Sequence, residues 1–401
     1  MPVFRARVLS PVGPREIDYW EDGVVVVEDQ WITEVGPYDG LPIDEDLRPG
    51  LLTPGFVDGH VHFPQARIVG AASGPLLRWL ERSVFPEEAR FADVEYASAV
   101  AREFCDALAR AGTTLALIYG SVHAEACQCL LEELDRRGLR AIVGPVLMDQ
   151  GAPPELLRPK ERALADLAAL EERWRDHPRL KIAVIPRFAL SCSEEMMRAA
   201  AALASERGLW VSTHISENLE ECQLTRDRFS APDYLEVYER VGLIHERTVL
   251  AHCIHLSAGE WDRVAGAGSV VAHCPDSNAF LGSGSMPIAE ALSREVPLTL
   301  GSDVAAGRSL RIPTAMAYAH DNGLRTNERL DPRQLLWWGT RGGAQALGHD
   351  QVGALRVGMV ADMVLHALPE RIQGEEAVLA SLLFDGDRPA PLRTWVGGRE
   401  L

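Results

Sequence analysis

The sequence predicts an α/β protein, a (β/α)8 TIM-like barrel with a small β-sandwich domain that both termini form together. Three observations carry this prediction. Apolar, β-branched segments alternate with amphipathic helical patterns through the middle of the chain, which is typical of parallel strands covered by helices. There are eight such segments, the number that a barrel of this kind requires. Short β patterns occupy both ends of the chain.

The terminal segments predict one composite β domain. Residues 24–36 (VVVVEDQWITEVG) are rich in β-branched side chains and are interrupted by a polar turn. The segments GALRVGMVADMVL (353–365) and LRTWVGGREL (392–401) have the same character. We therefore expect residues 1–50 and 352–401 to pair around a barrel domain that spans residues 51–351.

The predicted barrel strands are apolar runs at 51–58, 113–120, 141–148, 182–190, 210–216, 248–253, 269–275 and 297–304. Helical patterns fill the intervals between them, such as those at 99–112, 124–138 and 193–208, which end in glycine. Ser193 and the acids after it form a helix-start signal for the last of these. A doubly wound open sheet is the alternative on pattern alone, and the count of eight favours the barrel.

Composition narrows the class of protein. The 401 residues carry a net charge of −18, with 47% hydrophobic and 24% charged residues, as in ordinary globular proteins. The acidic balance argues against nucleic acid or an anionic membrane as partner. Seven cysteines without regular spacing indicate reduced thiols. With neither a signal-peptide pattern nor a membrane-spanning run, we expect a cytoplasmic protein.

Polar residues gather at the predicted carboxyl ends of the strands, where barrel active sites lie. Each histidine alone is more often a structural residue, but five of twelve fall at this one edge. His60 and His62 are two residues apart, so their side chains lie on one face of a strand, roughly 6.6 Å apart along it. Several imidazoles and a carboxylate suit a divalent ion, most often zinc. The full set is His60, His62, His214, Glu217, His252, His273 and Asp303.

A second histidine pattern is rejected as a metal site. His123 and Glu125, followed by two cysteines, imitate the H-x-E part of the cytidine-deaminase zinc motif. The P-C-x-x-C part of that motif is missing from the sequence. We therefore predict that this segment begins a helix.

The strand-end motifs resemble those of the amidohydrolase superfamily. They are, in order, PGFVDGHVH, THISE, TVLAHC, AHCPDSN and LGSDVAAG. More narrowly, HVHFPQ, LLRWLERSVFPEEARF, PRFALSCS and GGAQALG resemble the guanine deaminase family, over about residues 51 to 350. Phe63 and Pro64 depart from the small residues common in that family, which affects the pocket wall but not Gln65.

The resemblance implies a metal site, a fold and an assembly. His252 would lie beside the metal and its water, and His273 would have a structural or second-shell role. The family has a barrel with a β-sandwich from both termini and is usually homodimeric. The implied ligands of a single zinc ion per subunit are His60, His62, His214 and Asp303.

The number of metals can be checked against the lysines. Binuclear members of the superfamily carry a carboxylated lysine at the end of the fourth strand. Here that strand ends in Pro186-Arg187-Phe188, and Lys181 lies at its beginning. We therefore expect one metal per subunit, while zinc and iron are both compatible with the sequence.

The implied reaction is hydrolysis of guanine to xanthine and ammonia. Zinc with an open position lowers the pKa of bound water from 15.7 to about 7. Asp303 would accept the water proton and Glu217 would carry it to the ring nitrogen and the leaving amine. Arg187 would donate to the purine carbonyl oxygen, and Gln65 would bind an edge that carries both donors and acceptors. Phe188 and Trp79 would pack against the ring faces.

Two other functions are compatible with these motifs. The first is a zinc aminohydrolase acting on another amino-heterocycle, such as 8-oxoguanine, a pterin or a triazine. The combination of Gln65 and Arg187 favours a purine with a 6-oxo group over these. The second is a non-catalytic scaffold on the same fold, which the complete set of predicted ligands disfavours.

Overall fold

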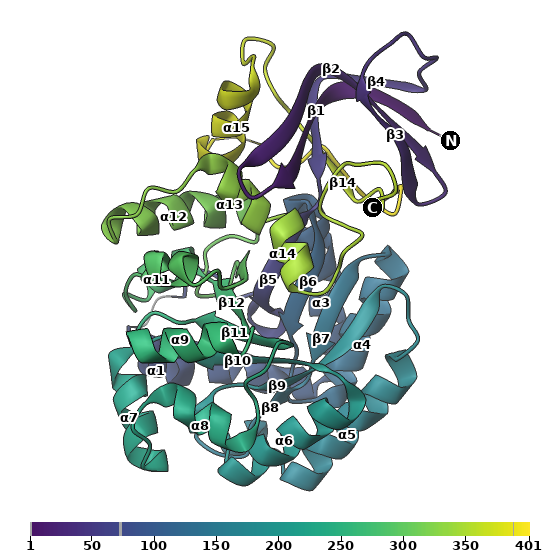
Figure 1. The fold of residues 1–401 in the computed structure, drawn as a ribbon. Coiled ribbons are helices and arrows are strands. Elements are labelled where there is room, and N and C mark those ends of the chain that lie inside the picture. Colours follow the sequence, from purple (N-terminus) through teal and green to yellow (C-terminus); the bar gives the residue numbers. More distant parts are fainter. Residues whose placement is uncertain (1, 72–73, 388) are drawn as a thin grey trace.

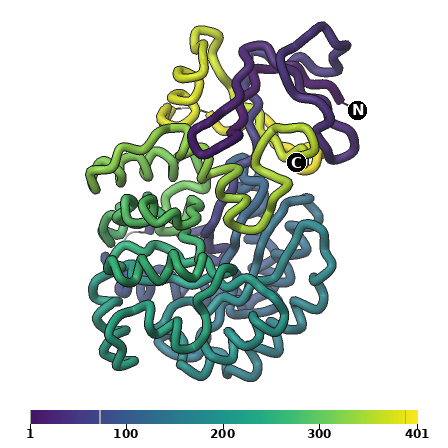
Figure 2. Tube along the Cα trace, in the orientation of Figure 1, coloured from purple at the N-terminus to yellow at the C-terminus, as the bar shows by residue number. Residues whose placement is uncertain are grey.

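Both ends of the chain belong to one sheet in the computed structural model, which describes residues 2–71, 74–387 and 389–401 (Figures 1 and 2). The strand order is β16-β15-β14-β4-β1-β2-β3. β1 pairs in parallel with β4, whereas the other neighbours are antiparallel, so the sheet is mixed. The strands are β1 Val3–Gly13, β2 Glu16–Glu28, β3 Trp31–Pro37, β4 Glu45–Pro54, β14 Met363–His366, β15 Arg393–Val396 and β16 Arg399–Glu400.

This terminal sheet curls around a small hydrophobic core of its own. The rings of Phe4 in β1 and Trp395 in β15 lie 5.6 Å apart between centroids, although β4 and β14 separate their strands. A flat sheet would hold strands three places apart at about 14 Å. Both rings belong to a core cluster with Val8, Val25 and Met363, distinct from the barrel core. The predicted composite of the two termini is confirmed as one curled sheet.

The second sheet holds eight parallel strands in consecutive order within the described residues, and helices surround it (Figure 1). The order runs β13-β12-β11-β10-β9-β7-β6-β5, with the short β8, Val146–Leu147, beside β9. The strands are almost entirely buried, as expected for a barrel that helices cover. They are β5 Phe56–His62, β6 Thr113–Tyr119, β7 Arg140–Gly144, β9 Leu180–Pro186, β10 Trp210–Ile215, β11 Thr248–His252, β12 Val270–His273 and β13 Leu298–Leu300.

The barrel closes between its first strand and the chain that follows its last strand. The N–H of Asp303 donates to the carbonyl oxygen of His60 at 2.8 Å, and the N–H of His62 donates to Val304 at 3.2 Å. A Cβ atom on Gly59 would lie 2.2 Å from Cγ2 of Thr299, so only glycine permits this approach. These contacts confirm the barrel and exclude the doubly wound open sheet.

The first predicted strand was wrong in its boundaries. Residues 51–58 were expected to form one barrel strand, but β4 ends at Pro54 in the terminal sheet and β5 begins at Phe56. Val57 pairs with β6, whereas Leu52 pairs with β14. His60 and His62 therefore lie within β5 rather than after it. The apolar run is continuous because both sheets bury it.

Helices connect the barrel strands, and the predicted signals at their ends are present. Ser193 accepts a hydrogen bond from the N–H of Met196 at the start of α6. Gly112, Gly138 and Gly208 adopt positive φ angles at the ends of α3, α4 and α6. The outer helices are α3 Val94–Ala111, α4 Ala124–Arg137, α5 Lys160–Trp174, α6 Glu194–Arg207, α7 Leu219–Phe229, α8 Tyr234–Val241, α9 Ala258–Gly266, α11 Ile288–Ser293, α12 Ile312–Arg325, α13 Pro332–Trp338 and α14 Arg341–Ala346.

Four further helices were not predicted as separate elements. α1, Leu76–Trp79, and α2, Phe85–Ala89, follow β5 and flank a π-helical turn at Leu80–Val84. α10, Pro275–Phe280, follows β12 directly. A fourth, α15 Glu375–Phe384, interrupts the C-terminal β segment and lies beside α12 and α13. Across the described ranges, we find no helix with the length and apolar character to cross a bilayer.

Candidate active site

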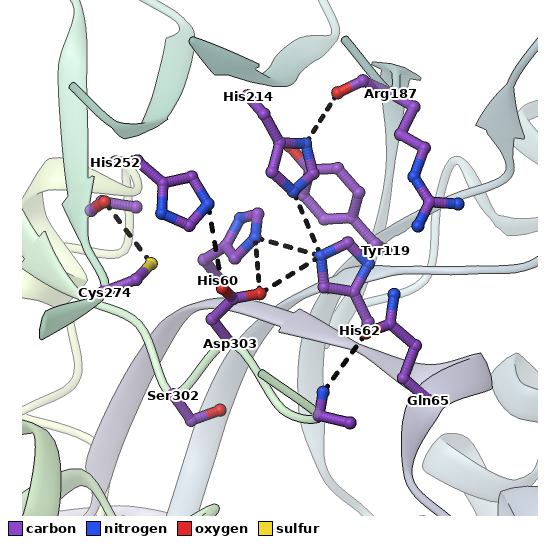
Figure 3. Close-up of polar contacts among 12 residues, drawn as sticks. His60, His62, Gln65, Tyr119, Arg187, His214, His252, Cys274, Ser302 and Asp303 are labelled. Carbon is purple, nitrogen blue, oxygen red and sulfur yellow. Dashed lines mark hydrogen bonds and ion pairs between the residues drawn. The ribbon is translucent and has the colours of Figure 1, made fainter. Parts of the chain in front are cut away.

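Four buried or half-buried side chains converge at the carboxyl ends of β5 and β10 and just after β13 (Figure 3). Nε2 of His62 lies 3.2 Å from Nε2 of His60 and 3.2 Å from Nε2 of His214. Oδ1 of Asp303 lies 3.3 Å from Nε2 of both His60 and His62. The ligand atoms of all four residues lie within 4.8 Å of one another. The four predicted metal ligands thus come together.

The spacing of these atoms fits a zinc ion. Ligand nitrogens about 2.0–2.1 Å from a tetrahedral zinc lie about 3.4 Å from one another. The separations of 3.2 and 3.3 Å here match that geometry. Three imidazoles and one carboxylate are also a donor set that zinc accepts. These four residues could therefore hold a divalent metal ion.

The imidazoles are held in the form that binds metal. Burial lowers the pKa of His62 to about 4 and the pKa of His214 well below its ordinary value, so both rings are neutral. Nδ1 of His214 lies 2.7 Å from the carbonyl oxygen of Arg187. Because a carbonyl only accepts, the proton sits on Nδ1 and the lone pair of Nε2 is left for the metal.

A second set of close ligand atoms does not form an independent site. It consists of His60, His252, Cys274 and Asp303, and it shares two members with the first set. Burial raises the pKa of the Cys274 thiol well above its ordinary value, whereas metals bind the thiolate. The thiol also contacts the carbonyl oxygen of Ala272.

Backbone strain concentrates at this end of the barrel. Ser216, His252 and Asp303 have φ angles of 51°, 74° and 47°. Residues other than glycine rarely adopt such angles, at a cost of about 1–3 kcal/mol each. Strain of this kind persists where the surrounding structure holds a side chain in a required position. Of these three residues, His252 and Asp303 line a cavity beside the predicted ligands.

His252 lies beside the four-residue cluster and bridges it to Glu217. Its Nδ1 is 2.8 Å from Oδ1 of Asn278, which fixes the proton on Nδ1 and leaves a lone pair on Nε2. Nε2 lies 3.4 Å from Oε2 of Glu217 and 3.7 Å from Oδ2 of Asp303. It makes no hydrogen bond within the described residues. A water or substrate atom between these groups would complete its bonding.

Glu217 is buried in a position suited to carrying a proton. Burial, reinforced by the charge of Asp303, raises the pKa of Glu217 to about 8. The hydroxyl of Ser283 donates to Oε1 of Glu217 at 3.3 Å. Glu221 accepts the main-chain N–H of Glu217 at 3.0 Å and the hydroxyl of Tyr234 at 2.6 Å. The backbone and the carboxyl group of Glu217 are therefore both held in place.

A cavity adjoins the four predicted ligands, with about 400 Å³ of empty space that includes its opening to solvent. Nine of the ten residues predicted to ligate metal, bind substrate or act in catalysis line it. The tenth, His60, lies behind them with the other three predicted metal ligands. Leucines supply most of the additional apolar wall. The lining residues are His62, Gln65, Leu76, Trp79, Leu80, Arg187, Phe188, His214, Glu217, Glu221, His252, Leu281, Asp303 and Ala306.

Gln65 and Arg187 are linked through a residue that the sequence did not single out. Nε2 of Gln65 donates to Oε1 of Glu88 at 3.0 Å, and Nη1 of Arg187 donates to Oε2 of Glu88 at 2.5 Å. All three side chains are buried. Glu88 lies in α2, so this helix joins the end of β5 to the end of β9.

A profile of the Amidohydrolase family matches residues 51–401. The chain belongs to the amidohydrolase family. Among its relatives, this amidohydrolase is 39% identical to a probable guanine deaminase of Deinococcus radiodurans, over 99% of this chain and 98% of that protein.

Two solved structures are similar over the whole chain. The guanine deaminase of E. coli superposes with a TM-score of 0.95 at 32% identity, covering 100% of this chain and 99% of that one. A guanine deaminase from C. acetobutylicum with guanine bound in its active site has a TM-score of 0.94 at 28% identity, with the same coverage.

The remaining predicted residues of this amidohydrolase occupy the expected elements. Lys181 is the second residue of β9, where its ammonium group contacts the carbonyl oxygen of His177, far along the strand from Arg187. His123 occupies the N-cap position of α4, without a capping hydrogen bond from its side chain, as predicted for a helix start. His273 is buried at the end of β12, but its ring nitrogens have no partner in the described part of the chain. The described residues thus provide no hydrogen bond through which the ring of His273 would support the predicted ligands.

Three functional contacts of the amidohydrolase escaped the sequence reasoning. The centroid of the Tyr119 ring lies 4.5 Å from that of His60 and 4.6 Å from that of His62, so Tyr119 packs against two of the predicted metal ligands (Figure 3). Asn278 orients His252 and belongs to the quoted AHCPDSN motif, which is a signal that could have revealed it. Glu88 lies in the quoted segment FPEEAR, but nothing in that segment distinguishes it from Glu87.

Proposed function

We propose that this amidohydrolase is a zinc-dependent guanine deaminase, which hydrolyses guanine to xanthine and ammonia. The observation that carries the proposal is the junction of two groups in one cavity. The four proposed metal ligands and Glu217 form one group. Gln65 and Arg187, whose side chains suit the edge of a purine, form the other. The similarity to guanine deaminases over nearly the whole chain supports it.

One zinc ion per subunit would be held by His60, His62, His214 and Asp303. When bound, zinc supplies a water acidic enough to act as a nucleophile near neutral pH. The absence of a lysine at the carboxyl end of the fourth strand supports a single ion, because the chain has only Lys160 and Lys181, and Lys181 lies at the start of that strand. Asp303 retains Oδ2 near His252, on the side away from its contacts with His60 and His62.

Proton movement is assigned to the chain's own side chains. Asp303 accepts the proton released by the attacking water, and His252 orients that water through its Nε2 lone pair. Glu217 donates a proton to the ring nitrogen beside C2, and the proton that Asp303 accepted passes to the exocyclic amine. The carbon–nitrogen bond at C2 then breaks, the amine leaves as ammonia, and the hydroxyl proton returns to Glu217 as the new carbonyl forms. The raised pKa of Glu217 supports its role as proton donor.

Substrate recognition is assigned to the opposite wall. Arg187 donates to the 6-oxo group, and Gln65 offers a donor and an acceptor to the same edge of the purine. Phe188 and Trp79 pack against the ring faces. The indole N–H of Trp79 is buried and has no hydrogen-bond partner in the described residues, which also favours a ligand that carries acceptors.

Assembly and compartment are proposed from the resemblance and the cysteines. We propose a homodimer in the cytoplasm, active in guanine catabolism. All seven cysteines are unpaired, which agrees with a reducing compartment. Sedimentation of the purified protein distinguishes a dimer from a monomer.

The test is release of ammonia from a panel of substrates by the zinc-loaded protein. Guanine, 8-oxoguanine, an amino-pterin and an amino-triazine are incubated separately, and we expect the highest kcat/KM with guanine. A higher value with another heterocycle would reassign the substrate. Ammonia release from none of them would overturn the deaminase and favour the scaffold.

A further inference from the structure

A buried carboxylate behind the cavity wall connects the two polar residues assigned to the purine edge. Glu88 is 5% exposed and does not line the cavity. Its two oxygens are divided between two partners, with Oε1 accepting from Gln65 and Oε2 accepting from Arg187. These partners come from segments that follow different strands, β5 and β9.

We propose that Glu88 is a positioning residue that sets the hydrogen-bonding pattern and the charge of the cavity wall toward the purine. This inference rests on the proposed function. It concerns which atoms of Gln65 and Arg187 face the substrate, and it assigns to Glu88 no contact with the substrate itself.

The orientation of the Gln65 amide follows from donor and acceptor chemistry. An ionised carboxylate only accepts hydrogen bonds, so the NH2 group of Gln65 must face Glu88. On its other side, Oε1 of Gln65 accepts the main-chain N–H of Ala305 at 3.3 Å. A flipped amide would place oxygen against carboxylate and NH2 against N–H. Glu88 and Ala305 therefore select one orientation, which keeps the second N–H and a lone pair of Gln65 for the ligand.

The charge of the cavity wall follows from the same contact. Arg187 and Glu88 are 3% and 5% exposed, so water screens their charges poorly. Their close pairing leaves the wall rich in N–H donors but without net positive charge. Such a wall suits a neutral 6-oxopurine and disfavours a purine anion such as urate.

The two effects predict changes of opposite sign when Glu88 is made neutral. In Glu88→Gln, one partner of the side-chain amide must lose its acceptor, and a buried group left unsatisfied costs about 1–3 kcal/mol, or about 5- to 150-fold. Guanine should therefore bind worse. Arg187 loses its counter-charge, so urate should bind better. A general loss of order in the cavity would instead weaken the binding of both guanine and urate.

The test compares Glu88→Gln with Glu87→Gln in the zinc-loaded protein. Glu87 is the adjacent buried acid of the same helix, but it pairs with Arg90 and Tyr96 instead. We expect Glu88→Gln to lower kcat/KM for guanine about 10- to 100-fold and to lower it much less for 2-aminopurine, which lacks the 6-oxo group. Inhibition by urate should tighten several-fold, metal content should not change, and Glu87→Gln should behave as wild type.

The outcomes separate this inference from the proposed function. Failure of the wild type to release ammonia from guanine overturns the function, whereas binding of guanine and urate, measured by thermal shift, still tests Glu88. Equal losses for guanine and 2-aminopurine, together with weaker urate binding, would reduce Glu88 to a structural residue. If Glu88→Gln does not fold, Glu88→Asp keeps the charge but shortens the side chain. Glu88→Asp should weaken the binding of guanine without strengthening the binding of urate.

Discussion

The carbonyl oxygen of Arg187 lies 2.7 Å from Nδ1 of His214 and also accepts the main-chain N–H of His214 at 3.1 Å. The guanidinium group of the same Arg187 bonds Glu88 and lines the cavity. One residue thus orients a proposed metal ligand through its main chain and faces the proposed substrate cavity through its side chain. Substitution of its side chain should therefore separate the two roles.

Arg187→Ala should retain the metal and lose substrate recognition. The carbonyl group that orients His214 remains, so metal content should equal that of the wild type. Hydrogen bonds to charged groups contribute about 1.5–3 kcal/mol, so kcat/KM for guanine should fall at least 10-fold. Ammonia release and metal analysis measure the two effects. Unchanged kinetics would refute the assignment of Arg187, and Arg90→Ala, outside the cavity, serves as control.

His214→Ala should lose the metal. It removes one of four ligand atoms, so metal affinity should fall by more than the about 10- to 100-fold that substitutions of outer partners cost. Bound metal per chain after dialysis measures this, with turnover falling in parallel. His273→Ala is the matched control, because His273 is buried at the same end of the barrel but lies outside the ligand set. Full metal retention by His214→Ala would contradict the site.

Glu217→Gln should bind metal normally but release ammonia slowly. The amide keeps the shape of the side chain and cannot donate and recover a proton, a function worth about 10² to 10⁴-fold. Steady-state ammonia release gives kcat, and metal analysis confirms the site. Glu220→Gln changes an exposed acid three residues along and should leave turnover unchanged. Normal turnover by Glu217→Gln would remove Glu217 from the mechanism.

Glu171→Gln should destabilise the protein in a pH-dependent way. The side-chain hydrogen bond from Arg175, at 2.7 Å, and a second from Arg207 lower the pKa of Glu171 from 4.5 to about 2. Its stabilisation is present above pH 4.5 and is lost as the pH falls toward 2. We expect about 1 kcal/mol less stability at pH 7.

Urea unfolding at pH 7 and at pH 3.5 measures this difference, which should narrow at the lower pH. Glu172→Gln, at the exposed neighbouring position, should change neither value. A difference that is constant with pH would mean that Glu171 stabilises α5 and α6 through packing and not through its charge.

The barrel could be predicted because its strands are buried on both faces and therefore stand out as apolar runs. The same property hid the boundary between β4 and β5. Leu52 packs in the core of the terminal sheet and Phe56 packs in the barrel core, so hydrophobicity does not fall between them. Pro54 and Gly55 were the only local signs of the change, and both also occur at strand ends.

The clustering of the four proposed metal ligands could be predicted because strand ends impose a common location on residues far apart in sequence. Glu88 could not be found in this way. It acts from a helix, beside Glu87 of the same residue type, and the two differ only in which way each side chain points. That direction depends on the packing of α2 against the barrel and leaves no periodic signal in so short a helix.

The curled terminal sheet has a consequence for synthesis of the chain. β4 lies between β1 and β14, yet β4 ends at Pro54 and β14 begins at Met363. On the ribosome, one edge of β4 stays unpaired until β14 has been made, and exposed strand edges promote aggregation. β14 is therefore the strand that covers the open edge of β4, and a chain terminated before β14 would leave that edge exposed.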